Sequence, residues 1–158
     1  MNSLRRTRRS FLKFSAIAGT LTAFAAAGLL KATQAAAAAW NKSGFESKAA
    51  ADAVKSLGAS GAAESRDIVI TAPDIAENGA VVPIEVVSRI PNTQSISIIA
   101  EKNPFPLAAT LDFANGAEPY AYVRIKMGQT SNVRAVVNAG GKFFTAAKEV
   151  KITIGGCG

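Results

Sequence analysis

Histidine is absent from this chain of 158 residues, and cysteine occurs only once, as Cys157. The lack of histidine excludes Ser-His-Asp and Cys-His nucleophilic sites, the common zinc sites, and haem attachment through C-x-x-C-H. The sequence also has no Walker-type phosphate loop, no G-x-G-x-x-G that opens a helix, and no D-x-D cluster. These absences argue against a self-sufficient enzyme, and we expect no metal or other cofactor to be bound.

Acidic residues are missing from the first 39 positions, which carry six of the 18 lysines and arginines. From Trp40 onward, 12 basic residues are balanced by 11 acidic ones, so the net charge of +7 comes mainly from the N-terminal segment. Nucleic-acid binding depends on a basic stripe that releases counterions from phosphates. No such stripe remains after residue 39, and we therefore expect no nucleic-acid partner.

The first 38 residues are typical of a twin-arginine signal peptide. TRRSFLK (7–13) carries paired arginines, an apolar run rich in Ala and Gly follows over 14–30, and QAAAAAW (34–40) offers small residues to a signal peptidase. A transmembrane anchor is the alternative, but the run is short and is interrupted by Gly19 and Thr20. No cysteine lies nearby to carry a lipid. We expect cleavage near residue 38, export of the folded protein to the periplasm, and no membrane anchor.

The segment SGFESKAAADAVKSLGAS (43–60) predicts one short helix over residues 44–57. Ser43 and Glu46 have the spacing of a capping box, and apolar residues then recur at helical spacing. Gly58 stands where the C′ glycine of a helix belongs.

After this helix the period of the apolar residues changes to two, as in YAYVRIKM (120–127). The other expected strands are DIVITA (67–72), VVPIEVVS (81–88), SISIIAE (95–101), AATLDFA (108–114), NVRAVVNA (132–139), KFFTAA (142–147) and EVKITI (149–154). NVRAVVNA and KFFTAA should form a hairpin through Gly140 and Gly141. Pro83 within an apolar run indicates an edge or bulged strand. The pattern predicts a mainly β fold, an immunoglobulin-like antiparallel sandwich over residues 39–154 with one N-terminal helix.

Three sets of aromatic residues are candidates for partner contacts. Phe105 lies in NPFPL (103–107), whose prolines favour a plain rigid turn. Trp40 could dock either on the sandwich or on a partner. Phe143 and Phe144 point to opposite faces of one strand, so one of the two rings could be exposed.

The single cysteine lies on a short glycine-rich tail. Cys157 follows Gly155 and Gly156 and precedes Gly158. The thiol is three residues beyond the last expected strand, which corresponds to roughly 10 Å of extended chain. Glycine adds no side-chain bulk and little conformational restriction. Residues 155–158 are therefore expected to form a flexible arm that carries the thiol into a narrow channel of another protein.

Three roles for Cys157 remain open on the residues alone. The thiol could be a reactive attachment point, it could form a disulfide between subunits of an exported interaction protein, or it could be incidental at a frayed terminus. A redox enzyme is disfavoured, because there is no second cysteine to resolve an intermediate and no histidine base. The terminal carboxylate on Gly158, one residue from the thiol, disfavours ionisation of the thiol. We therefore expect a positive site on a partner to activate Cys157.

The mature chain resembles the SoxY family, the sulfur-carrier subunits of the periplasmic thiosulfate-oxidising system. Four segments carry the resemblance: APDIAENGAVVPIEV (72–86), EKNPFPLAA (101–109), VRIKM (123–127) and KEVKITIGGCG (148–158). The last is the most specific, although the family pattern usually has one more glycine after the position of Gly158. The twin-arginine leader agrees with the export route of this family.

The resemblance implies an immunoglobulin-like sandwich that forms a heterodimer with a small β-protein, SoxZ. It implies that Cys157 is conjugated to thiosulfate by a c-type cytochrome complex similar to SoxAX. A manganese-dependent hydrolase similar to SoxB then releases sulfate, and in many organisms a sulfane dehydrogenase similar to SoxCD oxidises the remaining sulfur. In this scheme Gly155, Gly156 and Gly158 form the flexible arm, and the carrier itself catalyses no step.

Overall fold

The computed structural model describes residues 40–153. In chain order the elements of this range are α2 (Lys42–Phe45), α3 (Ala50–Ser56), β1 (Ala63–Glu64), β2 (Ile68–Thr71), β3 (Ile75–Ala76), β4 (Val82–Ser88), β5 (Thr93–Ala100), β6 (Leu107–Asp112), β7 (Tyr120–Ile125), β8 (Ser131–Ala139) and β9 (Lys142–Ile152). The predicted leader over 1–38 lies outside the described residues.

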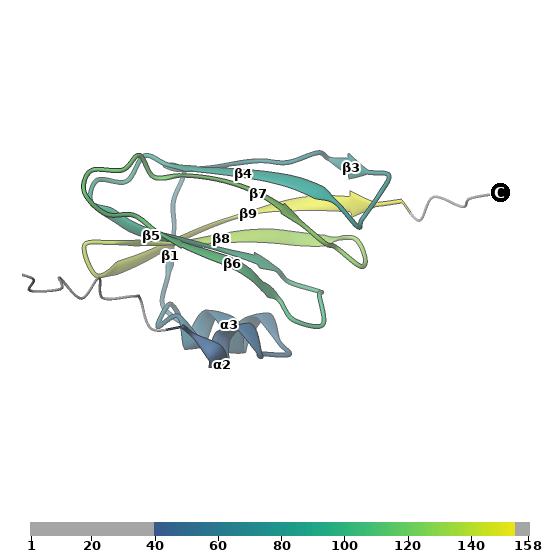
Figure 1. Ribbon diagram of the computed structural model, residues 1–158, viewed down its shortest axis with the longest axis horizontal. Helices are drawn as coiled ribbons and strands as arrows, with labels where there is room; N and C mark the ends of the chain where they lie inside the picture. Colours follow the sequence, from purple (N-terminus) through teal and green to yellow (C-terminus); the bar gives the residue numbers. More distant parts are fainter. Residues whose placement is uncertain (1–39, 154–158) are drawn as a thin grey trace, which may run out of the picture. The chain divides into compact units, whose positions relative to one another are not determined.

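The strands form two facing sheets (Figure 1). The larger sheet has the order β1-β9-β8-β5-β6, with β3 also paired to β9, and the smaller sheet has the order β2-β4-β7. Most pairs are antiparallel, but β1 and β3 both run parallel to β9. The predicted mainly β, immunoglobulin-like sandwich is confirmed, with the addition of these two short parallel pairs.

Alternation along the strands builds the core between the sheets. In β7 the side chains of Ala121 and Ile125 are buried, whereas Tyr120 and Tyr122 are exposed. The strand β4 alternates in the same way along its whole length. The fully buried side chains of this core include Val82, Ile84, Val86, Ile96, Ile98, Val133, Val137 and Val150. Removal of this apolar surface from water is the main stabilising contribution to the sandwich.

Pro83 lies in β4, which is the central strand of the smaller sheet and not an edge strand. The expectation of an edge strand was therefore wrong, but the underlying argument about hydrogen bonding holds. The pairing of β2 with β4 ends at Thr71 and Glu85, before Pro83 is reached. At Pro83 the strand is paired only with Arg124 of β7. The missing N–H of proline therefore interrupts no ladder on the β2 side.

KFFTAA and EVKITI belong to one continuous strand, β9, and not to two strands as expected. The pairing with β8 runs without a register shift from Ala139 opposite Lys142 to Ser131 opposite Val150. No glycine or proline interrupts the segment, so the strand continues for as long as β8 supplies partners. Phe143 and Phe144 point to opposite faces, and each packs against a separate apolar cluster. Neither of the two rings is exposed.

Two helices replace the single helix predicted over 44–57. The capping box is wrong as well, because the side chain of Asn41 accepts the hydrogen bond from the Gly44 N–H at 3.0 Å. A Cβ at Gly44 would lie 2.6 Å from Ser56 Oγ and 3.0 Å from Leu107 Cδ2. Because Gly44 lies this close to Ser56, α2 packs back against the end of α3. One continuous helix cannot make this reversal, and Ala49, between the two helices, is extended.

The C-terminal cap of α3 is formed as predicted. Gly58 has a φ of 75°, the left-handed conformation that favours glycine. Its N–H donates to the Lys55 carbonyl at 2.9 Å, and the Ala59 N–H donates to the Val54 carbonyl at 3.0 Å. These two hydrogen bonds form a Schellman motif.

The helices cover the outer face of the larger sheet (Figure 1). The cluster beneath them contains Ala53, Ala59, Ile99, Leu107 and Val136. The outer face of the smaller sheet has no such cover within residues 40–153. The molecule is thus layered as helices, larger sheet, core and smaller sheet.

Trp40 lies at the start of the described range and stacks on Phe45 of α2, with ring centroids 4.2 Å apart and planes at 7°. Trp40 remains 70% exposed. The ring thus contacts the first helix and leaves most of its surface open to solvent.

Candidate functional site

β9 is held firmly at its C-terminal end, where the chain continues toward the predicted arm. The N–H of Lys151 donates to the Asp74 carbonyl at 3.0 Å, and the N–H of Thr153 donates to the Ala76 carbonyl at 3.1 Å. These bonds belong to the short parallel pair between β3 and β9. The position from which residue 154 starts is therefore set by the sandwich.

Gly79 fits closely between the end of β9 and the chain that follows β7. Its carbonyl accepts a hydrogen bond from the Met127 N–H at 2.7 Å. A Cβ at this position would collide with the Met127 carbonyl oxygen and would lie 3.1 Å from Ile152 Cγ2. The N–H of Ile152 in turn donates to Thr130 Oγ1 at 2.9 Å. Only glycine permits these three segments to meet at the base of the arm.

Replacement of Gly79 by alanine should destabilise the fold, because the added methyl group meets backbone and not a flexible side chain. We expect the free energy of unfolding to fall by about 1–3 kcal/mol, the usual range for overpacking. Urea or thermal unfolding followed by circular dichroism measures this. Gly128→Ala is the matched control, since a Cβ at Gly128 meets nothing within 4 Å. Equal stability of the two variants would contradict the proposed close fit.

The predicted site residues Gly155, Gly156, Cys157 and Gly158 lie outside the described residues. The structure instead defines the surface from which they extend. That surface consists of the end of β9, the chain over 75–81, the turn over 101–106 and the turn over 126–130. We call it the arm-side end of the sandwich.

Asn103 joins two turns of the arm-side end. Its Nδ2 donates to the Lys126 carbonyl at 2.6 Å, and its Oδ1 accepts from the Gly128 N–H at 3.2 Å. Gln129 Nε2 donates to the Lys102 carbonyl at 3.3 Å. Three side-chain bonds therefore bring the β5–β6 and β7–β8 turns together, although they are far apart in the sequence.

The NPFPL segment forms the turn between β5 and β6, as the prolines predicted. The side chain of Pro106 is fully buried, and its carbonyl accepts from the Ala100 N–H at 2.8 Å. Phe105 is 50% exposed, and the ammonium of Lys48 lies 3.5 Å from the centre of its ring. This cation–π contact joins the turn to the helical layer.

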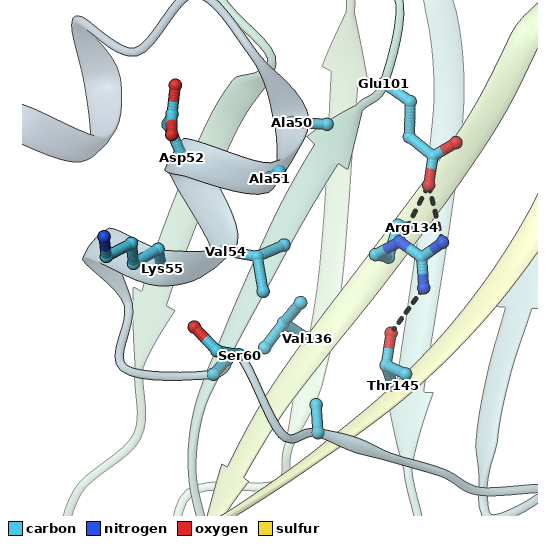
Figure 2. Close-up of a pocket in the computed structure, with 12 residues that line it drawn as sticks. Ala50, Ala51, Asp52, Val54, Lys55, Ser60, Glu101, Arg134, Val136 and Thr145 are labelled. Atoms are coloured by element: carbon cyan, nitrogen blue, oxygen red, sulfur yellow. Dashed lines mark hydrogen bonds and ion pairs between the residues drawn. The ribbon is translucent and has the colours of Figure 1, made fainter.

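The pocket in Figure 2 lies between α3 and the outer face of the larger sheet and has a volume of about 540 Å³. Arg134 lies in its wall and forms an ion pair with Glu101, with Nη2 and Oε1 2.7 Å apart. The Nε of Arg134 also donates to the same oxygen at 2.8 Å, and Nη1 lies 3.4 Å from Thr145 Oγ1. The guanidinium charge is thus already neutralised, which disfavours an anion site here. No spacing in the sequence connects Arg134 with Glu101, and sequence reasoning missed the pair.

The outer face of the smaller sheet displays Tyr120 and Tyr122, which are 44% and 50% exposed. Tyr120 Oη donates to Glu85 Oε2 at 3.4 Å. Desolvation, followed by the negative charge of Glu85, raises the pKa of Tyr120 above its ordinary value. This direction favours the protonated phenol over the phenolate.

Residues 40–153 contain no group of three or more acidic, Cys or His side chains that could hold a metal ion. Among the helices of this range, none is long and apolar enough to cross a membrane.

Comparison with known proteins identifies the chain. The family model described as "Sulfur oxidation protein SoxY" matches residues 53–157. The chain belongs to the SoxY family. The match includes Gly155, Gly156 and Cys157, and so extends through the residues predicted to form the arm.

A solved structure supports the assignment to the SoxY family. The sulfur carrier protein SoxY from Chlorobium limicola f thiosulfatophilum is 39% identical, with a TM-score of 0.61. The alignment covers 71% of this chain and 98% of that protein. A superoxide reductase (neelaredoxin) from Ignicoccus hospitalis is 21% identical with a TM-score of 0.49, over 56% of this chain and 81% of that protein. Comparison with curated protein sequences gives no match.

Proposed function

We propose that this SoxY-family protein is a covalent carrier of sulfur intermediates, and that it holds thiosulfate-derived adducts on Cys157. The observation that carries the proposal is the family match, which runs through residue 157 and so includes the only cysteine of the chain. The related protein from Chlorobium is described as a sulfur carrier. The absence of histidine agrees with a protein whose chemistry is performed by its partners.

The geometry of β9 supports a tethered thiol. The backbone is held as far as Thr153, and Cys157 is four residues further along the chain. Four extended residues span about 14 Å. Gly155 and Gly156 leave this length slender, so that it can enter a narrow active-site channel. The tether also keeps an intermediate bound while the protein passes from one enzyme to the next.

The proposed loading step is an oxidation that forms one S–S bond. The thiol of Cys157 and thiosulfate give the cysteine-S-thiosulfonate, one proton and two electrons, and a c-type cytochrome complex similar to SoxAX accepts the electrons. In the next step water cleaves the bond to the terminal sulfonate group. This releases sulfate and two protons and leaves a persulfide anion on Cys157. A manganese-dependent hydrolase similar to SoxB supplies this second activity.

The other proposed partners follow from the same family resemblance. A SoxZ-like subunit forms a heterodimer with this chain, and a SoxCD-like dehydrogenase oxidises the persulfide where it is present. The chain itself contributes no metal, no cofactor and no catalytic group. We place the protein in the periplasm, exported in the folded state by the leader over residues 1–38.

Intact-mass spectrometry tests the loading step directly. The purified protein is incubated with thiosulfate and the cytochrome complex, and we expect a mass gain of one thiosulfonate group that a reductant removes. A doubled mass that is lost on reduction, without the adduct, would support the alternative of an exported interaction protein crosslinked through Cys157. That result would contradict the carrier proposal.

A further inference from the structure

Lysine side chains project from three separate segments of the arm-side end. Lys102 lies in the β5–β6 turn, Lys126 follows β7, and Lys151 lies near the end of β9. All three are exposed, and none forms a salt bridge with another residue of the described range. One neighbouring cation differs in this respect, because Lys148 is paired with Asp74 at 3.0 Å.

The three lysines lie at one end of the sandwich, around the point where β9 ends. Lys126 points away from the core on the side of the smaller sheet, and Lys151 points away from it on the side of the larger sheet. The carbonyl of Lys126 accepts from Asn103, which is one residue beyond Lys102. Lys151 pairs with Ile75 in the β3–β9 ladder. Figure 1 shows the corresponding turns at the end of the sandwich where the arrow of β9 points. Two acidic residues at this end, Glu77 and Glu149, are also exposed and form no salt bridge within residues 40–153.

Large apolar side chains are exposed on the same end. Ile75 is 57% exposed and Val81 is 53% exposed. Ile75 lies directly beside Lys151, and Val81 precedes Val82, which pairs with Ile125 next to Lys126. Exposed apolar residues surrounded by polar ones are typical of interaction surfaces.

The length of the arm limits how far an enzyme that modifies Cys157 can be from this surface. The sulfur can be no more than about 14–16 Å from the point where Thr153 ends the held part of the chain. An enzyme whose active site lies at the bottom of a channel of about this depth meets the sandwich with the rim of its entrance. The residues around the base of the arm are the ones that contact such a rim.

We propose that the arm-side end is the docking surface for the enzymes that act on Cys157, and that it fits an entrance rimmed by carboxylates with an apolar contact. Lys102, Lys126 and Lys151 provide the charge, and Ile75 and Val81 provide the apolar contact. The proposal rests on the carrier function and adds the surface that partners recognise. Charges on the rim of an interface act mainly on the rate of association. Such a surface can be shared by several enzymes in turn, because it requires only a common charge pattern.

Charge reversal tests the docking surface. The variant K102E/K126E/K151E is compared with K142E/R66E/R89E, which makes the same change in net charge at the opposite end of the sandwich. The rate of thiosulfate conjugation by the cytochrome complex is measured between about 50 mM and 0.5 M salt. We expect kcat/KM of the first variant to fall at least about tenfold at low salt, and the difference to vanish at high salt as screening increases. The control set should stay within about twofold of the wild type.

Two further measurements keep the outcome unambiguous. Alkylation of Cys157 by iodoacetamide, together with circular dichroism, should be the same in both variants, which shows that the arm and the fold are intact. The variant I75S/V81S should raise KM several-fold at every salt concentration. If the lysine variant and the control set behave alike while Cys157 remains essential, the docking proposal is wrong and the carrier proposal stands. If conjugation continues without Cys157, the carrier proposal itself fails.

Discussion

The variant Cys157→Ser should lose thiosulfate conjugation by more than about a thousandfold in the reconstituted system. A serine hydroxyl is not ionised at neutral pH and forms no stable bond to the outer sulfur of thiosulfate, whereas a thiolate is both nucleophilic and oxidisable. No second cysteine can replace Cys157, because the chain contains only one. The adduct in the mass spectrum and the reduction of the cytochrome should disappear together.

The same variant should fold normally. The last strand of the described core ends at Ile152, five residues before Cys157 in the sequence, so the unfolding transition of Cys157→Ser should coincide with that of the wild type. Ser60→Ala is a suitable control, since Ser60 is exposed and lies far along the chain from the thiol. Retention of conjugation in Cys157→Ser would refute the carrier proposal.

Bulk on the arm should also reduce turnover strongly, although less than loss of the thiol does. The double variant Gly155→Val/Gly156→Val adds two β-branched side chains, which widen the tether and restrict its backbone. We expect turnover with the partner enzymes to fall by about a hundredfold, the scale of a small misplacement of reacting groups. Steady-state conjugation assays at saturating thiosulfate measure this effect.

A small alkylating reagent distinguishes an arm that no longer fits an enzyme channel from a thiol that has lost its reactivity. Iodoacetamide needs no channel, so its rate of reaction with Cys157 should change by less than about threefold in the valine variant. Gly61→Val is the matched control on the sandwich, since a Cβ at Gly61 meets nothing within 4 Å. Full enzymatic turnover in the valine variant would show that neither slenderness nor flexibility of the arm matters.

Strand positions could be predicted from the sequence because the period of two is a local property. β7 begins at Tyr120 as predicted, with its apolar residues on the core side. The expectation of an edge strand at Pro83 failed because it depends on a distant segment. The missing N–H of Pro83 is a local property and was predicted correctly. The number of strands beside Pro83, however, depends on where β2 lies and ends, and β2 is a separate segment.

In the helices, too, local features could be predicted from the sequence and long-range contacts could not. The glycine cap at Gly58 follows from local chemistry and was predicted. The break between α2 and α3 arises because Gly44 approaches Ser56 and Leu107. Leu107 is more than 60 positions away from Gly44, and no helical periodicity reports a contact of that kind.

The sequence by itself determined the chemistry of this protein: one thiol, a glycine-rich tail to carry it, no histidine, and a β-sandwich to hold it. These properties depend on residue types and on short-range spacing, which can be read directly. Only the tertiary structure decided what surrounds the base of the tail. Lys102, Lys126 and Lys151 come from segments far apart along the chain, and hydrogen bonds bring these segments to one end of the sandwich. Long-range contacts of this kind are selected by the packing of the whole sandwich.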